Sequence, residues 1–446
     1  MNHIKLKKGF KPSLAGMPDV STIQLPEPET VAVPALDIPY IRPKILVKEE
    51  HAVRIGTPLF CDKRNKSILY LSPGAGRIKQ IVFGPRRRLI EIVISLDKML
   101  NRDETHVLFE ALSQDEVDAV PRKQLVKMLQ DGGLWQCFRQ YPAKDTADED
   151  HIPPMIIVSL NGNDLFSPHP QVVLEKETAY FEFGLKILRQ LTRRIVVSCR
   201  ENSLHRLNGI SSSVTHVVPD TYPAWDPGTV LYKLKQTVED NLSWCISAEH
   251  LVLVAKLLLN GRYPVKRIVT VTRSHDKKPH VITRQGAPVN DLVGQIRETD
   301  VITTGRFNGR CVDPGSHLGF FETTLNVIPD SGGDEMFGFV RPGLFKTSVS
   351  KTFLSCLNPL PKDMDCTVHG EERACINCGY CTKICPVDLN PNFIMKALHS
   401  DDIENALRYG LLDCIRCGLC SYTCPSKIEL THILSNGMDS HFKDKE

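Results

Sequence analysis

Short apolar runs separated by glycine and proline turns characterise the chain up to about residue 100. Three of these runs, Lys44–Val47, Ile68–Leu71 and Leu89–Ile94, have the length of β-strands. Several such runs in succession, each bounded by turn residues, predict a β-rich domain. We therefore expect this domain over residues 34–100, preceded by an irregular, proline-containing N-terminal extension over residues 1–33.

The pattern becomes mixed over residues 101–262. Pro154–Leu160 and Arg194–Cys199 are apolar runs of buried-strand length, whereas Glu177–Leu191 and Ala248–Leu259 have helical periodicity. Strands that alternate with helices predict an α/β domain with a largely parallel sheet. We therefore expect a Rossmann-like α/β domain here.

A sheet of this kind often binds a nucleotide through a glycine-rich loop after its first strand. No Gly-x-Gly-x-x-Gly follows the first predicted strand, where Ser159–Asp164 has the composition of a turn. The pair Gly132-Gly133 precedes Leu-Trp-Gln-Cys-Phe-Arg, which is bulky where a phosphate needs small residues. A scaffold without nucleotide is favoured over a nucleotide-binding domain.

Residues 263–341 return to a β pattern. Val265–Arg273, a loop and Gly286–Val293 resemble the β-grasp (SLBB-like) modules that bind soluble ligands. Further β-like residues extend to Val340, with a turn at Ser331–Asp334. We expect a β-grasp domain over this segment.

The last domain is expected over residues 342–446, after a proline-containing hinge at Pro342-Gly343 and Asn358–Lys362. Within it, Asn392–Gly410 has apolar residues at spacings of three and four, which predicts one helix with Pro391 in its first turn. Asp401 and Glu404 could form a local cap.

Composition narrows the class of protein. The chain has 446 residues, 41% apolar and 24% charged, which is typical of a soluble globular protein with several domains. A net charge of +3 argues against a nucleic-acid-binding surface. No apolar stretch approaches the length of a transmembrane helix, and Met1–Pro12 does not resemble a signal peptide. We expect a cytoplasmic protein without a transmembrane span.

The distribution of the 15 cysteines indicates metal chemistry. Eight crowd between positions 375 and 424, and crowded cysteines in a reducing compartment indicate a metal site. Seven stand alone and are expected to be small buried residues. They are Cys61, Cys137, Cys199, Cys245, Cys311, Cys356 and Cys366.

The eight crowded cysteines repeat one pattern. Each run reads Cys-x-x-Cys-x-x-Cys-x-x-x-Cys-Pro, the bacterial two-cluster ferredoxin spacing. Three closely spaced thiolates wrap one 4Fe–4S cubane, while the fourth cysteine of each run ligates the other cubane. This predicts two 4Fe–4S clusters in an α-helical ferredoxin domain. One is held by Cys375, Cys378, Cys381 and Cys424, the other by Cys414, Cys417, Cys420 and Cys385.

Neighbouring residues suit this geometry. Pro386 and Pro425 would turn the chain away from each cluster, and Gly379 and Gly418 would let the backbone approach inorganic sulfide. Zinc is the alternative, but its sites use two separated ligand pairs rather than runs of four that end in Cys-Pro. Iron–sulfur clusters are therefore favoured.

Other candidates are weaker. Arg86–Arg88 could meet phospholipid or an acidic partner, but a solvated turn explains it. No hydrolytic signature is present. Four isolated histidines are expected to be surface or packed side chains rather than ligands: His275, His280, His317 and His369.

The β-rich domain has a resemblance of its own. Val47–Leu59 followed by Ser72–Ile78 resembles the barrel-sandwich hammerhead of biotinyl and lipoyl domains. Lys63 falls near the position of their prosthetic lysine, but the surrounding Cys61–Lys66 segment lacks their signature. An ordinary exposed turn lysine is favoured.

Most of the chain before the cysteine runs resembles the A subunit of the sodium-translocating NADH:quinone oxidoreductase (Nqr). The domain order also resembles the homologous C subunit of the Rnf ferredoxin:NAD oxidoreductase, which carries the eight-cysteine pattern that the Nqr subunit lacks. The Rnf subunit's glycine-rich flavin and NADH loop is missing here. The segments that carry the Nqr resemblance are Ile4–Pro18, Gly132–Arg139, Asn163–Pro170 and Val265–Val293.

The resemblance implies a peripheral electron-transfer subunit on the inner face of the cell membrane, not catalytic alone. It would relay electrons through two clusters between a soluble donor protein and a flavin- or quinone-carrying membrane partner. Partner subunits would move sodium ions or protons. FMN and NADH are not expected on this chain. Two alternatives remain open: an iron–sulfur adaptor that links a soluble dehydrogenase or hydrogenase to a quinone-reducing module, and a structural scaffold whose clusters only stabilise the fold.

Overall fold

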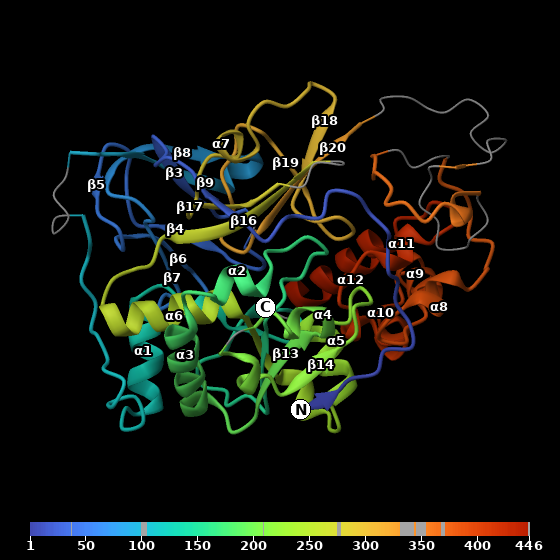
Figure 1. Cartoon of the computed structure of the whole chain (residues 1–446), viewed down its shortest axis with the longest axis horizontal. Coiled ribbons are helices and arrows are strands. Elements are labelled where there is room, and N and C mark those ends of the chain that lie inside the picture. Colours follow the sequence, from blue (N-terminus) through green and yellow to red (C-terminus); the bar gives the residue numbers. More distant parts are fainter. Residues whose placement is uncertain are drawn as a thin grey trace.

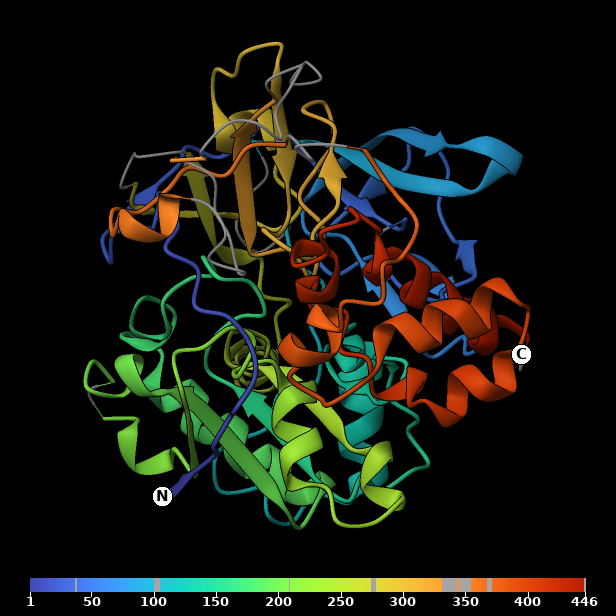
Figure 2. The ribbon, with the colours of Figure 1, turned by 90° about the vertical axis from the view of Figure 1, so that its right-hand side faces the viewer.

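The structure, a computed structural model, describes residues 1–36, 38–99, 105–207, 209–273, 278–330, 343–344, 354–366 and 371–444. The β-rich segments (blue and yellow) lie on one side of the molecule and the α/β segments (green) on the other (Figure 1). The C-terminal helices (red) pack against both at one end (Figure 2). The predictions for His275, His369 and the turn at 331–334 fall outside the described residues, as do the domain boundaries at 100–101 and 341–342 and Pro342 of the predicted hinge.

The first domain is β-rich, as predicted. Its longest hairpin pairs two strands in which apolar residues are buried, so that Ile78 lies opposite Ile94. Within the described residues, its strands form two antiparallel sheets. One has the order β3 (Thr30–Pro34), β9 (Leu89–Leu96), β8 (Gly76–Phe83), β5 (Ala52–Val53), and the other β4 (Pro43–Ile45), β6 (Pro58–Asp62), β7 (Leu69–Leu71).

The prediction of an irregular N-terminal extension over residues 1–33 is wrong. This segment supplies strands to three different sheets. β1 (Asn2–His3) pairs with β14, β2 (Thr22–Gln24) with β17, and β3 with β9. These strands are short and their partners are distant in the chain, so local apolar patterning does not reveal them.

The second domain contains a mixed sheet in the order β1–β14–β13–β12–β15–β10–β11. It is parallel from β1 to β15, and β10 and β11 are antiparallel. The described strands are β10 (Arg139–Gln140), β11 (Asp145–Thr146), β12 (Ile156–Ser159), β13 (Ile195–Arg200), β14 (His216–Val218) and β15 (Trp244–Ser247).

The predicted helices of this domain are present as α3 (Thr178–Leu191) and α6 (Ala248–Asn260), which lie side by side (Figure 1). The Ser247 hydroxyl accepts a hydrogen bond from the His250 N–H and so caps α6 at its first residues. Shorter helices complete the domain: α1 (Arg122–Asp131), α2 (Pro170–Leu174), α4 (Glu201–Leu204) and α5 (Pro227–Leu234).

The pair Gly132-Gly133 serves packing. A Cβ atom on Gly133 would lie 2.5 Å from the Leu71 side chain, and one on Gly132 would lie 2.3 Å from Leu257. The following Trp135 and Phe138 are fully buried. Packed side chains therefore surround the glycine pair, and it does not form an open loop of the kind that holds a phosphate.

The six-stranded sheet of the described residues has the order β19–β18–β20–β16–β17–β2. The β pattern predicted for Gly286–Val293 is wrong, because Val289–Val293 forms the short helix α7. Val289 and Leu292 point into the core of this domain at a helical spacing of three, which a short apolar run does not distinguish from a strand. The strands are β16 (Lys266–Arg273), β17 (His280–Arg284), β18 (Asp300–Thr303), β19 (Cys311–Val312) and β20 (Thr324–Pro329).

The C-terminal domain is helical in its described residues. The single helix predicted over Asn392–Gly410 is instead two helices, because the helical conformation ends at His399 and resumes at Ile403. The cap of the second helix is Asp402, whose carboxylate accepts from the Asn405 N–H, and not the predicted Asp401. The helices are α8 (Tyr380–Ile384), α9 (Pro391–His399), α10 (Ile403–Arg408), α11 (Leu419–Tyr422) and α12 (Leu430–Asp444).

Candidate iron–sulfur site

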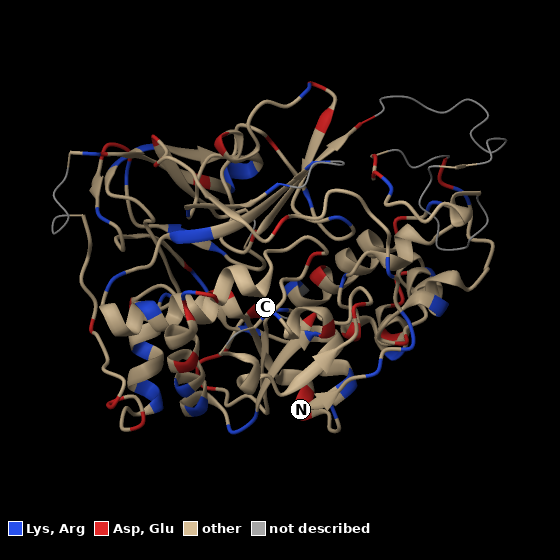
Figure 3. Ribbon diagram, in the orientation of Figure 1, with Lys and Arg blue, Asp and Glu red and all other residues tan. Residues whose placement is uncertain are grey.

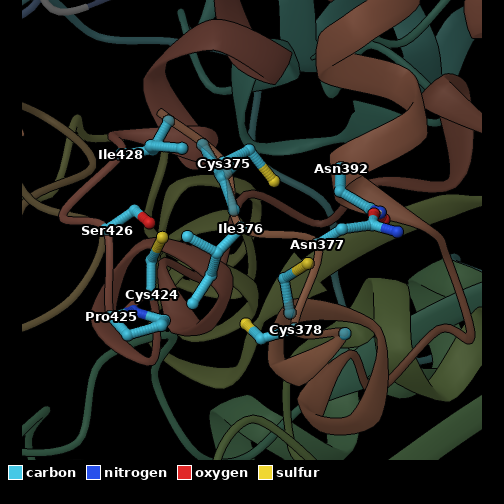
Figure 4. Close-up of a pocket in the computed structure, with 12 residues that line it drawn as sticks. Cys375, Ile376, Asn377, Cys378, Asn392, Cys424, Pro425, Ser426 and Ile428 are labelled. Carbon is cyan, nitrogen blue, oxygen red and sulfur yellow. The ribbon is translucent and has the colours of Figure 1, made fainter. Parts of the chain in front are cut away.

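Two cavities in the C-terminal domain are each lined by four of the predicted cysteines. The outer cavity brings together three cysteines of the first run and the last cysteine of the second run: Cys375, Cys378, Cys381 and Cys424. Figure 4 shows Cys375 and Cys378 on one segment of the chain and Cys424 on another, around a common space. The cavity holds about 350 Å³ of non-atom space, open solvent included.

The inner cavity has the reciprocal composition. It is lined by three cysteines of the second run and the last cysteine of the first: Cys414, Cys417, Cys420 and Cys385. Its non-atom space is also about 350 Å³. The chain therefore groups its eight cysteines by exchanging the fourth member of each run.

Local backbone geometry places the third cysteine of each run. Gly379 (φ 74°) and Gly418 (φ 82°) adopt left-handed conformations that start α8 and α11, and these helices carry Cys381 and Cys420. Glycine reaches this conformation without the steric cost that a Cβ atom imposes. In each run, the glycine thus makes the turn before a short helix, and that helix fixes the position of the third cysteine.

The two glycines differ in their surroundings. A Cβ atom on Gly379 would have no neighbour within 4 Å, whereas one on Gly418 would lie 1.9 Å from the Phe307 carbonyl oxygen. Gly418 is therefore required where the C-terminal helices meet the loop between β18 and β19. The predicted reason, approach to sulfide, does not account for this contact.

The cavities also differ in depth. At the outer cavity Cys378 is exposed, and the intervening Ile376 retains 68% of its accessible surface. At the inner cavity Cys385 is buried, and the Leu419 side chain packs against the second domain. The outer set thus contains the one exposed cysteine of the eight, whereas every inner cysteine is buried or half-buried.

Burial changes the acidity of the inner cysteines. Loss of water raises the pKa of Cys385 to about 11 and that of Cys420 to about 12. The same cause raises the pKa of Cys414 and of Cys417 above the ordinary thiol value. These four groups are neutral thiols at pH 7 in the protein without metal. Because metals bind thiolates, occupation of the inner cavity must release protons.

Several supporting contacts were not predicted from the sequence. The Tyr222 hydroxyl donates to the Cys417 carbonyl oxygen at 2.9 Å, and Lys8 Nζ donates to the Thr382 carbonyl oxygen at 3.2 Å. The Cys420 sulfur lies 3.3 Å from the Thr431 hydroxyl. Each contact joins residues that are separated in the chain, so a local sequence motif does not predict it.

No three His, Cys, Asp or Glu side chains in the described ranges are grouped so as to hold a single metal ion. A zinc ion gathers all its thiolates on one atom at about 2.3 Å. A cubane instead distributes its thiolates over separate iron atoms and therefore needs a cavity between them. The donor set and the shared hollows fit a cubane.

The seven isolated cysteines are only partly buried. Four follow the prediction, but Cys311 and Cys356 are exposed and Cys366 is half-buried. Cys311 stands on the short strand β19 at the edge of its sheet, where one face remains open to solvent. The buried cysteines are Cys61, Cys137, Cys199 and Cys245.

The described histidine candidates are packed side chains. His280 is fully buried and bonds Thr270, while His317 lies 3.1 Å from the Glu91 carboxylate. Lys63 is exposed in the turn after β6, and Arg86 is exposed in the β8–β9 hairpin. These positions agree with the structural roles predicted for them.

Together, a helical domain with two four-cysteine cavities and a β-rich and α/β body define an iron–sulfur protein of several domains. Family models match residues 4–97 as the NqrA N-terminal barrel-sandwich hybrid domain and residues 120–263 as the NqrA second alpha/beta domain. A 4Fe-4S dicluster domain matches residues 367–425. The chain is thus similar to NqrA over these two segments and carries a 4Fe–4S dicluster domain after them.

Curated relatives agree with this assignment. The A subunit of the Na(+)-translocating NADH-quinone reductase of Marinomonas sp. (strain MWYL1) is 29% identical over 415 residues, 92% of each chain. The same subunit of Saccharophagus degradans is 28% identical over 417 residues, again 92% of each chain. These proteins are homologues of this chain.

Among solved structures, an NAD+-reducing [NiFe]-hydrogenase in the H2-reduced state is similar at a TM-score of 0.36. The identity is 10%, with 77% of this chain and 68% of that chain covered. This likeness is too slight to support an argument. In the described part of the chain, no helix combines the length and apolar character needed to cross a bilayer.

Proposed function

We propose that this protein is the peripheral electron-transfer subunit of an Nqr- or Rnf-like membrane redox complex. The observation that carries the proposal is the exchange of the fourth cysteine between two cavities of equal size. A chain that only needed metal to stabilise its fold could do so with one site. Two adjacent sites, one facing solvent and one facing the protein body, suit passage of electrons between a donor and an acceptor.

The ligands follow from the cavity linings. Cys375, Cys378, Cys381 and Cys424 would hold one 4Fe–4S cluster, and Cys385, Cys414, Cys417 and Cys420 the other. When bound, such a cluster takes up and releases one electron at a time at a potential set by its surroundings. The protein positions the thiolates, buries the inner set and supplies hydrogen bonds around it, and these are the factors that tune such potentials.

The rest of the chain is proposed to be a scaffold that docks this unit. We propose a Rossmann-like second domain over residues 101–262 and an SLBB-like β-grasp domain over residues 263–341. The packed side chains after Gly132-Gly133 support an absence of bound nucleotide. FMN and NADH would therefore reside on partners, unlike in the Rnf C subunit that the cysteine-rich tail resembles.

The partners follow from the homologues. The curated relatives are subunits of Na(+)-translocating NADH-quinone reductases. We propose that this chain sits on the inner face of the cell membrane, bound to membrane-embedded and flavin-carrying subunits that move sodium ions or protons. A soluble protein would exchange electrons with the outer site.

Anaerobic purification followed by iron and acid-labile sulfide analysis tests the proposal. We expect about eight irons and eight sulfides per chain, from two cubanes with four thiolates each. Electron paramagnetic resonance of the reduced protein should show two interacting centres. Zinc, or no metal, in oxygen-free material would contradict the electron-transfer role.

A further inference from the structure

A face with both aromatic and basic residues lies beside the outer cavity. Four large apolar side chains are exposed there: Ile376 by 68%, Tyr380 by 36%, Phe393 by 43% and Tyr409 by 43%. Phe393 and Tyr409 contact each other, with ring centroids 5.8 Å apart. Clusters of exposed apolar residues commonly mark interaction sites. We name this group, together with Lys383 and Lys396, the aromatic–basic face.

The lysines lie against the aromatic rings. Lys383 Nζ is 5.6 Å from the Tyr380 ring centroid, and Lys396 Nζ is 5.7 Å from the Phe393 ring centroid. Each lysine follows its aromatic residue by three positions. The two members of each pair therefore lie on the same side of their helix, α8 for one pair and α9 for the other. The ammonium groups therefore border the apolar residues.

The charged side chains of the two helices that carry the lysines have one sign. The sequences of α8 and α9 contain two lysines and a histidine but no aspartate or glutamate. Asp388, between the two helices, is engaged by Lys8 at 2.9 Å and Lys233 at 3.3 Å. These helices lie at the right-hand end of the molecule in Figure 1, and Figure 3 shows both basic and acidic residues around them.

The face also adjoins the outer cysteines. Ile376 stands between Cys375 and Cys378 and lines the outer cavity while remaining exposed. Asn392, next to Phe393 on α9, lines the same cavity and donates to the Asn377 side chain at 3.0 Å. A protein seated on this face would come close to the outer set of thiolates.

We propose that the aromatic–basic face docks a small acidic electron-carrier protein. The inference rests on the proposed electron-transfer function. An acidic carrier complements the lysine border, and its apolar contact surface covers the exposed aromatic residues. One electron passes from the reduced centre of the carrier to the outer site, so the carrier is oxidised and the site reduced by one electron. No bond forms or breaks.

The test uses the full chain loaded with clusters under anaerobic conditions, and an acidic 2Fe–2S ferredoxin as the probe. Calorimetry gives the dissociation constant, and stopped-flow absorbance gives the rate at which the reduced ferredoxin is oxidised. The test variant is Lys383→Glu with Lys396→Glu. The matched control is Lys123→Glu with Lys127→Glu, two exposed lysines on α1 at the opposite end of the molecule (Figure 1).

We expect the test variant to raise the dissociation constant at low salt by about tenfold or more, and to slow electron transfer similarly, because complementary charge steers association. High salt should remove most of the difference. The control variant should behave like the unaltered chain. The inference would be overturned if the test variant bound the ferredoxin as tightly as the unaltered chain does. It would also be overturned if the control variant bound as weakly as the test variant, or if the unaltered chain did not bind the ferredoxin.

Two further measurements keep the outcomes distinct. Lys383 lies between two predicted ligands, so Lys396→Glu alone, with Phe393→Ser as a companion, replaces the double variant if cluster content falls. Tighter binding of a basic cytochrome c than of the ferredoxin would also overturn the inference. Iron analysis separates the two proposals. A chain without iron contradicts the proposed function, whereas a loaded chain with unaltered binding contradicts only this docking face.

Discussion

The Tyr222 hydroxyl donates a hydrogen bond to the main-chain carbonyl oxygen of Cys417 over 2.9 Å. Tyr222 belongs to the second domain and is almost fully buried, and its ring lies 5.3 Å from that of Phe307. This bond therefore joins the body of the protein to the loop that carries the inner cysteines. It provides a way to perturb one site without touching a ligand.

We expect Tyr222→Phe to lower the free energy of unfolding by about 1–3 kcal/mol, since the buried carbonyl loses its donor. A chelator should also extract iron from the inner site faster, while the outer site is unchanged. Urea denaturation and electron paramagnetic resonance during chelation measure the two effects. Tyr180→Phe on α3, away from the cysteines, is the control. Equal behaviour of both variants would show that the bond is not needed.

Paired substitutions test the exchange of the fourth cysteine. Cys378→Ser with Cys424→Ser removes two thiolates from the outer cavity alone. About four irons should therefore remain per chain. Cys378→Ser with Cys385→Ser damages both cavities, and almost no iron should remain. If each run instead held its own cluster, the two iron contents would be reversed.

The equivalent glycines of the two runs should differ in their tolerance of alanine. Gly379→Ala meets no neighbouring atom within 4 Å and should cost only about 1–2 kcal/mol for a left-handed backbone. Gly418→Ala would place a Cβ atom 1.9 Å from the Phe307 carbonyl oxygen, so the loop must move. Thermal unfolding and iron content are the measurements. Loss of iron from the inner site in Gly418→Ala only is expected, and equal effects would contradict the close approach of Phe307 to Gly418.

His280 should make stability depend on pH. Burial, together with repulsion between two protonated imidazoles at His280 and His169, lowers the pKa of His280 from 6.5 to about 4, although Asp19 acts in the opposite direction. Its Nε2 atom lies 3.4 Å from the His169 N–H and accepts from it, and its Nδ1 atom lies 2.9 Å from the Thr270 hydroxyl. A proton on Nε2 would abolish the first bond.

The unfolded chain binds this proton below about pH 6.5, whereas the folded chain does not until about pH 4. The free energy of unfolding should therefore fall as the pH is lowered from 6.5 to 4, by at most about 1.4 kcal/mol per pH unit for this group. His280→Gln should reduce that slope, but not abolish it, since the pKa of His250 is also lowered to about 4. Urea denaturation at several pH values measures the slope. An unchanged slope would exclude His280 as a contributor.

Much of the fold was predictable because its signals are local. The apolar runs that became β9, β12 and β13 and the periodic segments that became α3 and α6 have the length and spacing of their elements. The errors arose where partners lie far along the chain. β1 and β2 are short strands that exist because β14 and β17 offer an edge to pair with.

The sequence by itself determined the chemistry of the candidate site. Cysteine spacing, with Gly379 and Gly418 before the third cysteine of each run, already specifies two sets of thiolates, because turns and single helical turns depend on neighbouring residues. Only the tertiary structure decided which set is buried, since burial depends on distant residues such as Tyr222 and Phe307. It is this long-range packing that leaves Cys378 of the outer set exposed and covers the inner set more fully.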